Sequence, residues 1–181
     1  MSTASHTARA KDAVALLTAD HSKVKQLFTE YEKQQNIGDI SLKADLALHI
    51  CLELTIHTTI EEEIFYPAVR RETGDQHLVE EAIQEHAEAK ELIARIQGMA
   101  GDDPDLDGTV AILRRAIEHH VQEEESQMFP KARASDADLT ALCEQLQERK
   151  EQLEHDMSAA PLRAGTREAR GERSAIGQAD S

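Results

Sequence analysis

The chain has 181 residues, of which 40% are apolar and 3% aromatic, and it carries a formal net charge of −15 at pH 7. This length suffices for one domain with a substantial core. The charge argues against direct binding to nucleic acid, which draws on clustered Lys and Arg. No stretch has the uninterrupted apolar run of a membrane span, and the first ten residues lack the apolar core of a secretory signal. We therefore expect a cytoplasmic protein that binds neither nucleic acid nor a membrane.

The composition favours an all-α fold. Few Gly and Pro residues, no Trp, and many Leu, Ala, Glu, Gln and Lys residues are typical of packed helices. Apolar residues recur at three- and four-residue spacing, and this pattern predicts helices over residues 10–34, 41–66, 76–97, 108–129 and 136–157. We expect a flexible N-terminus over residues 1–9, a helical bundle over residues 10–157 and a disordered tail over residues 158–181.

A doubled motif is the most informative feature of the chain. Each copy sets a histidine four residues before a glutamate and closes on an aromatic residue followed by proline. The copies run from His57 to Pro67 and from His120 to Pro130, with Glu61 and Glu124 as the glutamates. Because residues four apart share a helix face, each histidine and its glutamate project from the same side, one turn apart.

The duplication extends upstream of both copies. Asp20-His21 resembles Glu85-His86, and these histidines precede those of the motif by 36 and 34 positions. The chain is therefore a tandem repeat of one helix pair, and two helix pairs close into an up-down four-helix bundle. The segment over residues 136–157 has an apolar stripe without a further ligand pair, so we expect an additional helix that packs on the outside of the bundle.

The four histidines occupy core-facing stripes where aliphatic residues are expected. On the third predicted helix, the stripe comprises Val79, Ala82, Ile83, His86, Ile93 and Ile96. A single core histidine is ordinarily structural, but a charged glutamate is costly in a core unless it is paired. Two such glutamates at matching points, each beside a histidine, indicate a metal site rather than a plain structural bundle.

Four imidazoles and two carboxylates suit iron, manganese or zinc, and they do not suit ions that prefer thiolates. Two ions explain the symmetry of this set better than one. Two six-coordinate ions have about 12 positions, of which the protein donors and an oxo or hydroxo bridge fill about ten. About one position per ion then remains for a small molecule such as dioxygen or peroxide.

These residues resemble the hemerythrin-like family, the HHE cation-binding domain, over about residues 10–155. The ordered set is His21, His57, Glu61, His86, His120 and Glu124. The resemblance implies a bundle with a non-heme di-iron centre, in which the two glutamates bridge the ions and the four histidines are terminal ligands. It leaves open which two histidines share an iron.

One departure from the family bears on function. Oxygen-carrying hemerythrins have an additional histidine about one turn from the third-helix ligand, but the positions four before and four after His86 are Ala82 and Lys90. A less saturated iron pair coordinates exogenous ligands more freely. The resemblance therefore implies reaction with peroxide, dioxygen or nitric oxide. We further expect a monomer or weak dimer. The alternative is a non-catalytic iron or oxygen sensor, a carrier or an iron-storage protein.

Other side chains near the motif can be interpreted either as ordinary structural residues or as functional ones. Lys25 and Lys90 each follow a predicted ligand by four residues. This recurrence indicates a lid or an ion pair over the site, although most lysines on a helix surface are simply exposed to solvent. Tyr31 and Tyr66 are candidate hydrogen-bond donors or ligands, but Tyr66 lies about 180° from His57 on an ideal helix, which argues against it. Glu53 is a spare ligand or a support for one, or, in the favoured interpretation, an exposed rim residue.

The remaining candidates are predicted to lie outside the site. His119 is expected to point beside His120, Cys51 and Cys143 to be core residues, and the following to be solvated: Glu62, Glu63, Glu123, Glu125, His6, His49, His77 and His155. Ferritin-like bundles use Glu-x-x-His and many metalloproteases His-Glu-x-x-His, and neither pattern occurs in the chain. Turnover would separate a catalyst from a sensor, and metal content would separate both from a structural bundle.

Overall fold

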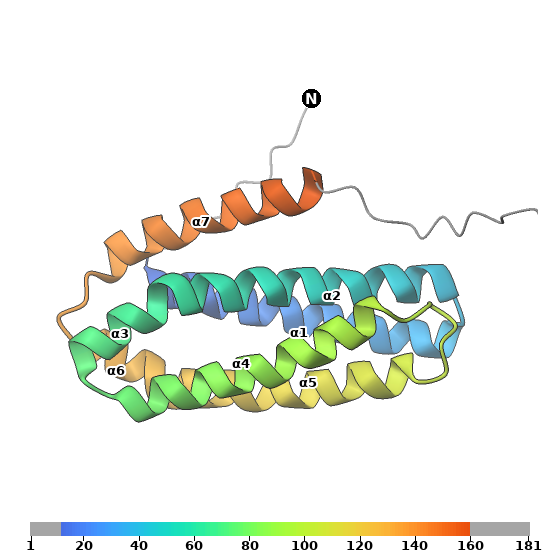
Figure 1. Ribbon diagram of the computed structural model, residues 1–181, viewed down its shortest axis with the longest axis horizontal. Coiled ribbons are helices and arrows are strands. Elements are labelled where there is room, and N and C mark those ends of the chain that lie inside the picture. The colour runs from blue at the N-terminus through green and yellow to red at the C-terminus, as the bar shows by residue number, and fades with distance from the viewer. Residues whose placement is uncertain (1–11, 160–181) are drawn as a thin grey trace, which may run out of the picture.

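The computed structural model describes residues 12–159, and this part of the chain is a helical bundle without strands (Figure 1). Its elements are α1 (Ala13–Ile37), α2 (Ile40–Ile60), η1 (Glu61–Phe65), α3 (Tyr66–Thr73), α4 (Gln76–Gln97), α5 (Leu106–Glu123), η2 (Glu124–Met128), α6 (Phe129–Ala134) and α7 (Leu139–Ala159). The all-α prediction is confirmed. The expected flexible N-terminus lies outside the described residues, as does the tail, except that α7 extends through Ala159.

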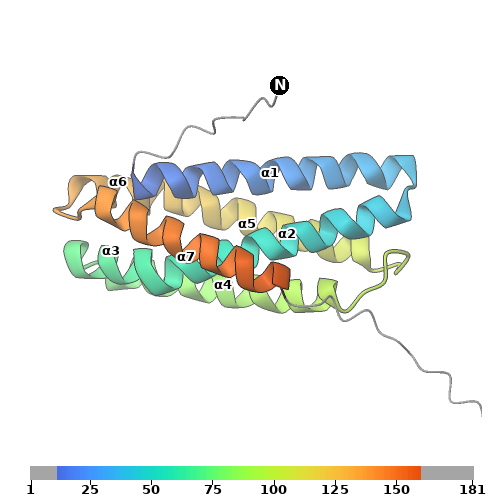
Figure 2. The same cartoon turned by 90° about the horizontal axis from the view of Figure 1, so that it is seen from above.

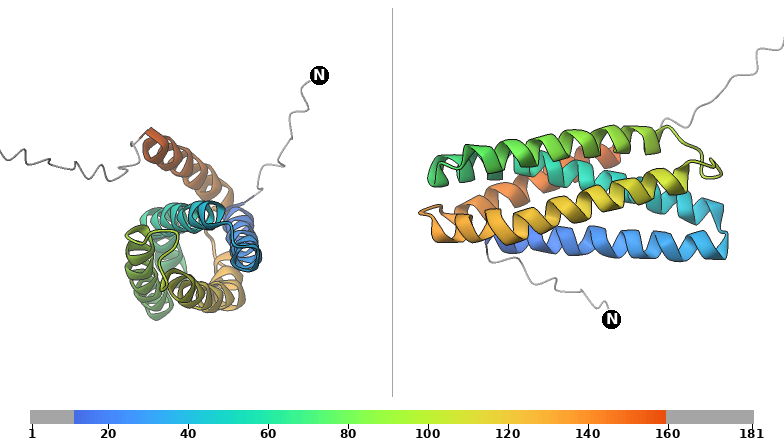
Figure 3. Two further views of the ribbon diagram at one scale, coloured as in Figure 1. Left: turned by 90° about the vertical axis from the view of Figure 1, so that its right-hand side faces the viewer. Right: turned by 90° about the horizontal axis from the view of Figure 1, so that it is seen from below.

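Four long helical segments close the bundle in up-down order. Two of them are single helices, α1 and α4, and the other two are the runs α2–η1–α3 and α5–η2–α6. Viewed from the end, α1 lies beside α2, α2 beside α4, α4 beside α5, and α5 beside α1 (Figure 3). The predicted four-helix bundle is therefore confirmed.

Short polar residues and glycines set the helix ends. The side chains of Asp12, Asp39 and Asp75 each accept a hydrogen bond from a backbone N–H in the first turn of the helix that follows. Gly38 and Gly74 end the first two segments in the left-handed region, with φ of 83° and 68°, where an L side chain would be strained.

The second and fourth segments run further than the sequence predicted. The expected ends were residues 66 and 129, but helix continues to Thr73 and Ala134. Pro67 and Pro130 do not interrupt the helical segments, because each lies in the first turn after a π-helical turn, where its missing N–H is tolerated. The π turns η1 and η2 were not predicted, and they occupy the same place in both copies of the motif.

Two apolar clusters fill the bundle, one on either side of a polar middle. One contains Leu17, Ile60, Phe65, Val79 and Met128, and the other contains Phe28, Ile50, Leu54, Ile93 and Leu113. On each long segment, one buried histidine falls between these two clusters: His21, His57, His86 or His120. Ile83, which the sequence placed on the inner stripe, is 38% exposed, because the third helix buries a narrower face than its apolar pattern predicted.

Helix α7 crosses the outside of the bundle obliquely, over α1 and the α2–η1 run (Figures 1 and 2). It buries Leu142, Cys143 and Leu146 against the first apolar cluster. The predicted outer helix is confirmed. Within residues 12–159, no helix has the length and apolarity needed to traverse a lipid bilayer.

Candidate metal centre

The structure brings all six predicted site residues to one place in the middle of the bundle. The histidines come from four different helices: His21 from α1, His57 from α2, His86 from α4 and His120 from α5. Glu61 and Glu124 are the first residues of η1 and η2. All six are buried, with at most 6% of any residue exposed.

The histidines form two pairs. The Nε2 atoms of His21 and His57 lie 3.1 Å apart, as do the Nε2 atoms of His86 and His120. Groups of potential metal donors follow the same division: His21 and His57 with both glutamates, and His86 and His120 with Glu61. The sequence left the pairing open, and the tertiary structure joins the histidines of each helix pair.

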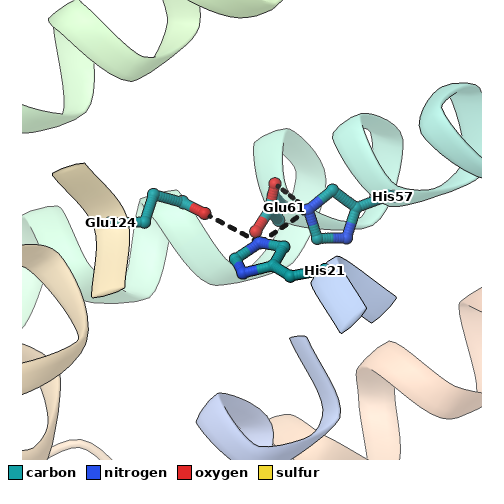
Figure 4. A group of neighbouring side chains, drawn as sticks. All are labelled: His21, His57, Glu61 and Glu124. Carbon is teal, nitrogen blue, oxygen red and sulfur yellow. Dashed lines mark hydrogen bonds and ion pairs between the residues drawn. The ribbon is translucent and has the colours of Figure 1, made fainter. Parts of the chain in front are cut away.

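Each glutamate lies between the two histidine pairs. Glu61 Oε2 is 3.2 Å from Nε2 of His57 and 3.4 Å from Nε2 of His86. Glu124 Oε2 is 3.2 Å from Nε2 of His21 and 3.5 Å from Nε2 of His120. Figure 4 shows the first histidine pair with both carboxylates directed toward it. The carboxylates therefore stand where they can be shared by two cations.

Three carboxylates outside this cluster contact Nδ1 of a site histidine, on the side of the ring away from Nε2. His21 Nδ1 lies 2.9 Å from Glu125 Oε1, and His86 Nδ1 lies 2.9 Å from Glu62 Oε1. Glu125 is exposed and Glu62 partly exposed, in line with the prediction that they are solvated, but the sequence did not predict that each reaches the histidine of a neighbouring helix. Such contacts orient a histidine and strengthen its other nitrogen as a donor.

The third of these carboxylates, Glu85, lies 2.8 Å from His120 Nδ1. Its position in the sequence, directly before His86, matches that of Asp20 before His21. The repeat was visible in the sequence, but the cross-helix contact was not, because Glu85 supports the histidine of the other helix and not its neighbour in the chain. His119 points aside as expected, with its side chain 65% exposed and Nε2 3.5 Å from Glu85 Oε1.

Tyr66 lies inside the site, contrary to prediction. Its hydroxyl donates to Glu124 Oε1 at 2.9 Å, and it lies 3.2 Å from His86 Nε2 and 3.5 Å from Glu61 Oε2. The 180° argument assumed a regular α-helix, whereas η1 inserts one extra residue and turns the following side chains by about 100°. The π turn thus moves Tyr66 from the outer face to the cluster.

The second copy of the motif places an apolar ring where the first has a phenol. Phe129 follows η2 as Tyr66 follows η1, and it stacks on His21 with ring centroids 5.6 Å apart and an interplanar angle of 5°. The pair of His86 and His120 therefore has a hydroxyl beside it, and the pair of His21 and His57 has a phenyl ring. The repeat is symmetric in its donors and asymmetric in this respect.

The electrostatics of the cluster favour a bound cation. Burial and the charge of Glu124 raise the pKa of Glu61 well above its usual range. Burial opposes protonation of His21, but Glu124 and Glu61 outweigh it and raise the pKa of that histidine to about 9. Burial lowers the pKa of His57 to about 4, so this imidazole is neutral, the form that binds metal. In the metal-free protein, protons bound to the site residues therefore offset the negative charge of the two carboxylates.

The residues present fit a metal ion in their chemistry. Nitrogen and oxygen donors converge in a buried place, and Glu61 Oε1 has no hydrogen-bond partner among the described residues. A buried carboxylate oxygen without a partner is costly unless a cation neutralises it. This donor set suits iron, manganese or zinc.

The other sequence candidates lie away from the cluster. Glu53 is buried rather than exposed at the rim, and it pairs with Lys23 and His49 instead of a site residue. Tyr31 donates to Asp107 at 2.6 Å, in the second apolar cluster. As expected, His49, His77 and His155 have exposed side chains, and Cys51 and Cys143 are buried. His6 lies outside the described residues.

The two lysines of the repeat behave differently. Lys90 Nζ donates to both carboxylate oxygens of Glu62 at 2.7 Å, which confirms an ion pair over His86. Lys25 instead lines a cavity of about 440 Å³ between α1 and α5, whose apolar walls are Val24, Phe28, Ile117 and Val121. His21 lines this cavity, and a smaller cavity that shares His21, Val24, Ile117 and Val121 with it touches all four histidines.

Fold and site together define a helical-bundle protein with a buried His/Glu cation site. The hemerythrin HHE cation binding domain model matches residues 12–132, and the chain belongs to this family. The structure also resembles a hemerythrin HHE cation binding domain-containing protein from Mycobacterium kansasii, with a TM-score of 0.68, 23% identity and coverage of 80% of this chain and 88% of that one.

One curated relative is a DNA nickase from a Nostoc species. It is 32% identical to this chain over 114 residues, which is 63% of this chain and 31% of the relative. The match therefore spans about a third of the relative's length. The family match contains all six site residues and ends before α7.

Proposed function

We propose that the bundle holds two iron ions, one at His21 and His57 and one at His86 and His120, with Glu61 and Glu124 shared between them. The observation that carries this proposal is the position of each Glu Oε2 between histidines of both pairs, at 3.2–3.5 Å from their Nε2 atoms. When bound, such an iron pair supplies redox chemistry toward dioxygen, peroxide or nitric oxide.

The protein's own residues prepare the site for a small oxidant. Glu125, Glu62 and Glu85 orient three of the histidines, and Tyr66 holds a proton on its hydroxyl beside the second pair. Burial and the neighbouring carboxylates raise the pKa of Tyr66, so it remains a hydrogen-bond donor at neutral pH. The two apolar clusters on either side limit water around the histidines.

The α1/α5 cavity supports access from one side. This cavity reaches His21 of the first pair, whereas the ion pair of Lys90 with Glu62 lies beside His86 of the second pair. Val121 stands on the wall of both the outer and the inner cavity and is only partly buried. A small molecule entering here reaches the imidazole of His21 first.

We expect Val121→Trp to slow the reaction of the iron-loaded protein with peroxide several-fold, because the larger ring fills this passage. Metal content and the visible spectrum at rest should stay unchanged. Ile112→Trp is the matched control, since Ile112 lies on the same helix and is 51% exposed. Stopped-flow absorbance after peroxide addition measures the effect, and equal rates in the two variants would exclude this path.

Metal loading should release protons at neutral pH. His21 has its pKa raised to about 9, so the metal-free protein carries a proton there that the ion must displace. The apparent affinity should therefore rise with pH from 7 to 9, by about tenfold per unit for each displaced proton, and level off above. Calorimetric titration with zinc, in two buffers of different ionisation enthalpy, measures this directly. An affinity independent of pH would contradict it.

The proposed function is tested by metal analysis and a visible spectrum of freshly purified protein, followed by peroxide addition with oxygen evolution recorded. Two irons per chain with sustained oxygen release support an enzyme that consumes peroxide. Two irons with a spectral change and no turnover support a sensor or carrier instead. If the purified protein contains no metal and is as stable as the protein after metal has been added, both the enzyme and the sensor or carrier are excluded.

DNA cleavage is not part of this proposal. The nickase from Nostoc shares only about a third of its length with this chain. The net charge of −15 also disfavours binding to duplex DNA, which draws on clustered Lys and Arg. A supercoiled plasmid incubated with the metal-free protein is expected to remain intact.

A further inference from the structure

One of the four histidines lacks the support that the other three have. Nδ1 of His21, His86 and His120 each lies 2.8–2.9 Å from a carboxylate oxygen. Nδ1 of His57 is buried and has no hydrogen-bond partner among the described residues. The nearest carboxylate oxygen, Asp20 Oδ2, is 3.8 Å away, beyond hydrogen-bonding distance.

The repeat shows what His57 is missing. Asp20 precedes His21 as Glu85 precedes His86, and Glu85 supports His120, the counterpart of His57, at 2.8 Å. Asp20 is shorter than Glu85 by one methylene group. It also has a partner that Glu85 does not: the ammonium of Lys150 donates to Asp20 Oδ1.

Lys150 belongs to α7, the helix that lies beyond the family match. Its side chain is 18% exposed and that of Asp20 is 11% exposed, so the ion pair is largely shielded from water. The adjacent Arg149 donates to Glu63, whose carboxylate does not contact a site histidine. Figure 2 shows α7 running across α1 and α2, the two helices that carry Asp20 and His57. Two neighbouring residues of α7 therefore form ion pairs with the bundle, and of the two carboxylates only Asp20 lies near a site histidine.

We propose that Lys150 is a positioning residue for His57: it holds the Asp20 carboxylate away from His57 Nδ1 and so leaves this histidine the weakest donor of the four. A histidine whose Nδ1–H is held by a carboxylate binds metal more tightly through Nε2. The ion at His21 and His57 is therefore held less firmly than its neighbour. This consequence rests on the proposed function, whereas the position of Asp20 does not.

The position of Asp20 is tested in metal-free, ¹⁵N-labelled, full-length protein. In Lys150→Met, we expect the ring resonances of His57 to show a hydrogen-bonded Nδ1–H, because Asp20 is released to accept it. Lys150→Arg should keep the wild-type pattern, and so should Arg149→Met, which removes the neighbouring ion pair of α7. An unchanged His57 spectrum in Lys150→Met would overturn the proposal and show that the short Asp20 side chain alone sets the distance.

The consequence for metal is tested by the rate at which a chelator removes it. Wild-type protein should lose its two ions in two phases, and Lys150→Met should slow the faster phase by about tenfold, the lower end of the usual effect of such contacts. Arg149→Met should not slow it, and a slowing of the same size in that variant would overturn the assignment to Lys150. If no variant binds metal, the proposed function fails, but the metal-free spectra still decide the role of Lys150.

Discussion

Replacing Glu61 by alanine is expected to remove most of the bound metal from both positions. Glu61 Oε2 lies within 3.4 Å of one histidine from each pair, so neither of the two proposed cations would keep its full set of donors. A ligand present at 100 times its dissociation constant stabilises the folded state by about 2.7 kcal/mol. Its loss should lower the melting temperature of the loaded protein by roughly 5–10 °C for a domain of this size.

In the metal-free protein, removing the charge of Glu61 is expected not to lower the stability of the folded state. In the metal-free protein, Glu61 is buried beside Glu124, and the two carboxylates raise the free energy of the folded state unless a proton neutralises one of them. Glu61→Gln keeps the size of the side chain and removes its charge. We expect metal-free Glu61→Gln to be at least as stable as the metal-free wild type, although it binds metal more weakly.

Elemental analysis and thermal melts with and without chelator measure both effects. His77→Ala is the control, since the side chain of His77 is 87% exposed on α4, and it should match the wild type throughout. His57→Ala should lose metal as Glu61→Ala does. Equal metal content in all of these variants would refute the assignment of the site.

If the site holds the proposed iron pair, replacing Tyr66 by phenylalanine should leave the metal content unchanged and slow the proposed reaction with peroxide. The Tyr66 hydroxyl contacts both Glu124 and His86, and Tyr66 is not one of the six residues proposed to hold the metal. A positioned proton donor contributes typically about 100-fold or more to a rate. We therefore expect peroxide consumption to fall by about that factor, while loss of the hydrogen bond to Glu124 costs about 1–3 kcal/mol of stability.

Tyr31→Phe is the matched control for this variant. Tyr31 is equally buried and also donates to a carboxylate, that of Asp107, but it lies outside the site. It should lose comparable stability and keep the wild-type rate. Initial rates of peroxide consumption at equal iron content distinguish the two, and equal rates in both variants would show that Tyr66 has only a structural role.

The sequence alone predicted the helices, the bundle and the six residues that converge in its middle. These features depend on local periodicity and on the repeat, both of which are written along the chain. His57 and Glu61 share a helix face at any tertiary arrangement, and two such pairs on adjacent helix hairpins can bury their polar groups only against one another.

Tertiary structure alone decided which histidines pair, which carboxylates support them and whether Tyr66 enters the site. Glu62 and Glu85 hold histidines on other helices, and such contacts depend on how helices rotate about their axes in the packed bundle. Tyr66 enters because η1 inserts one residue into a helix, and a single insertion turns every later side chain by about 100°. Helical periodicity in the sequence does not predict that change of direction, because a projection at 100° per residue assumes α-helical hydrogen bonds throughout.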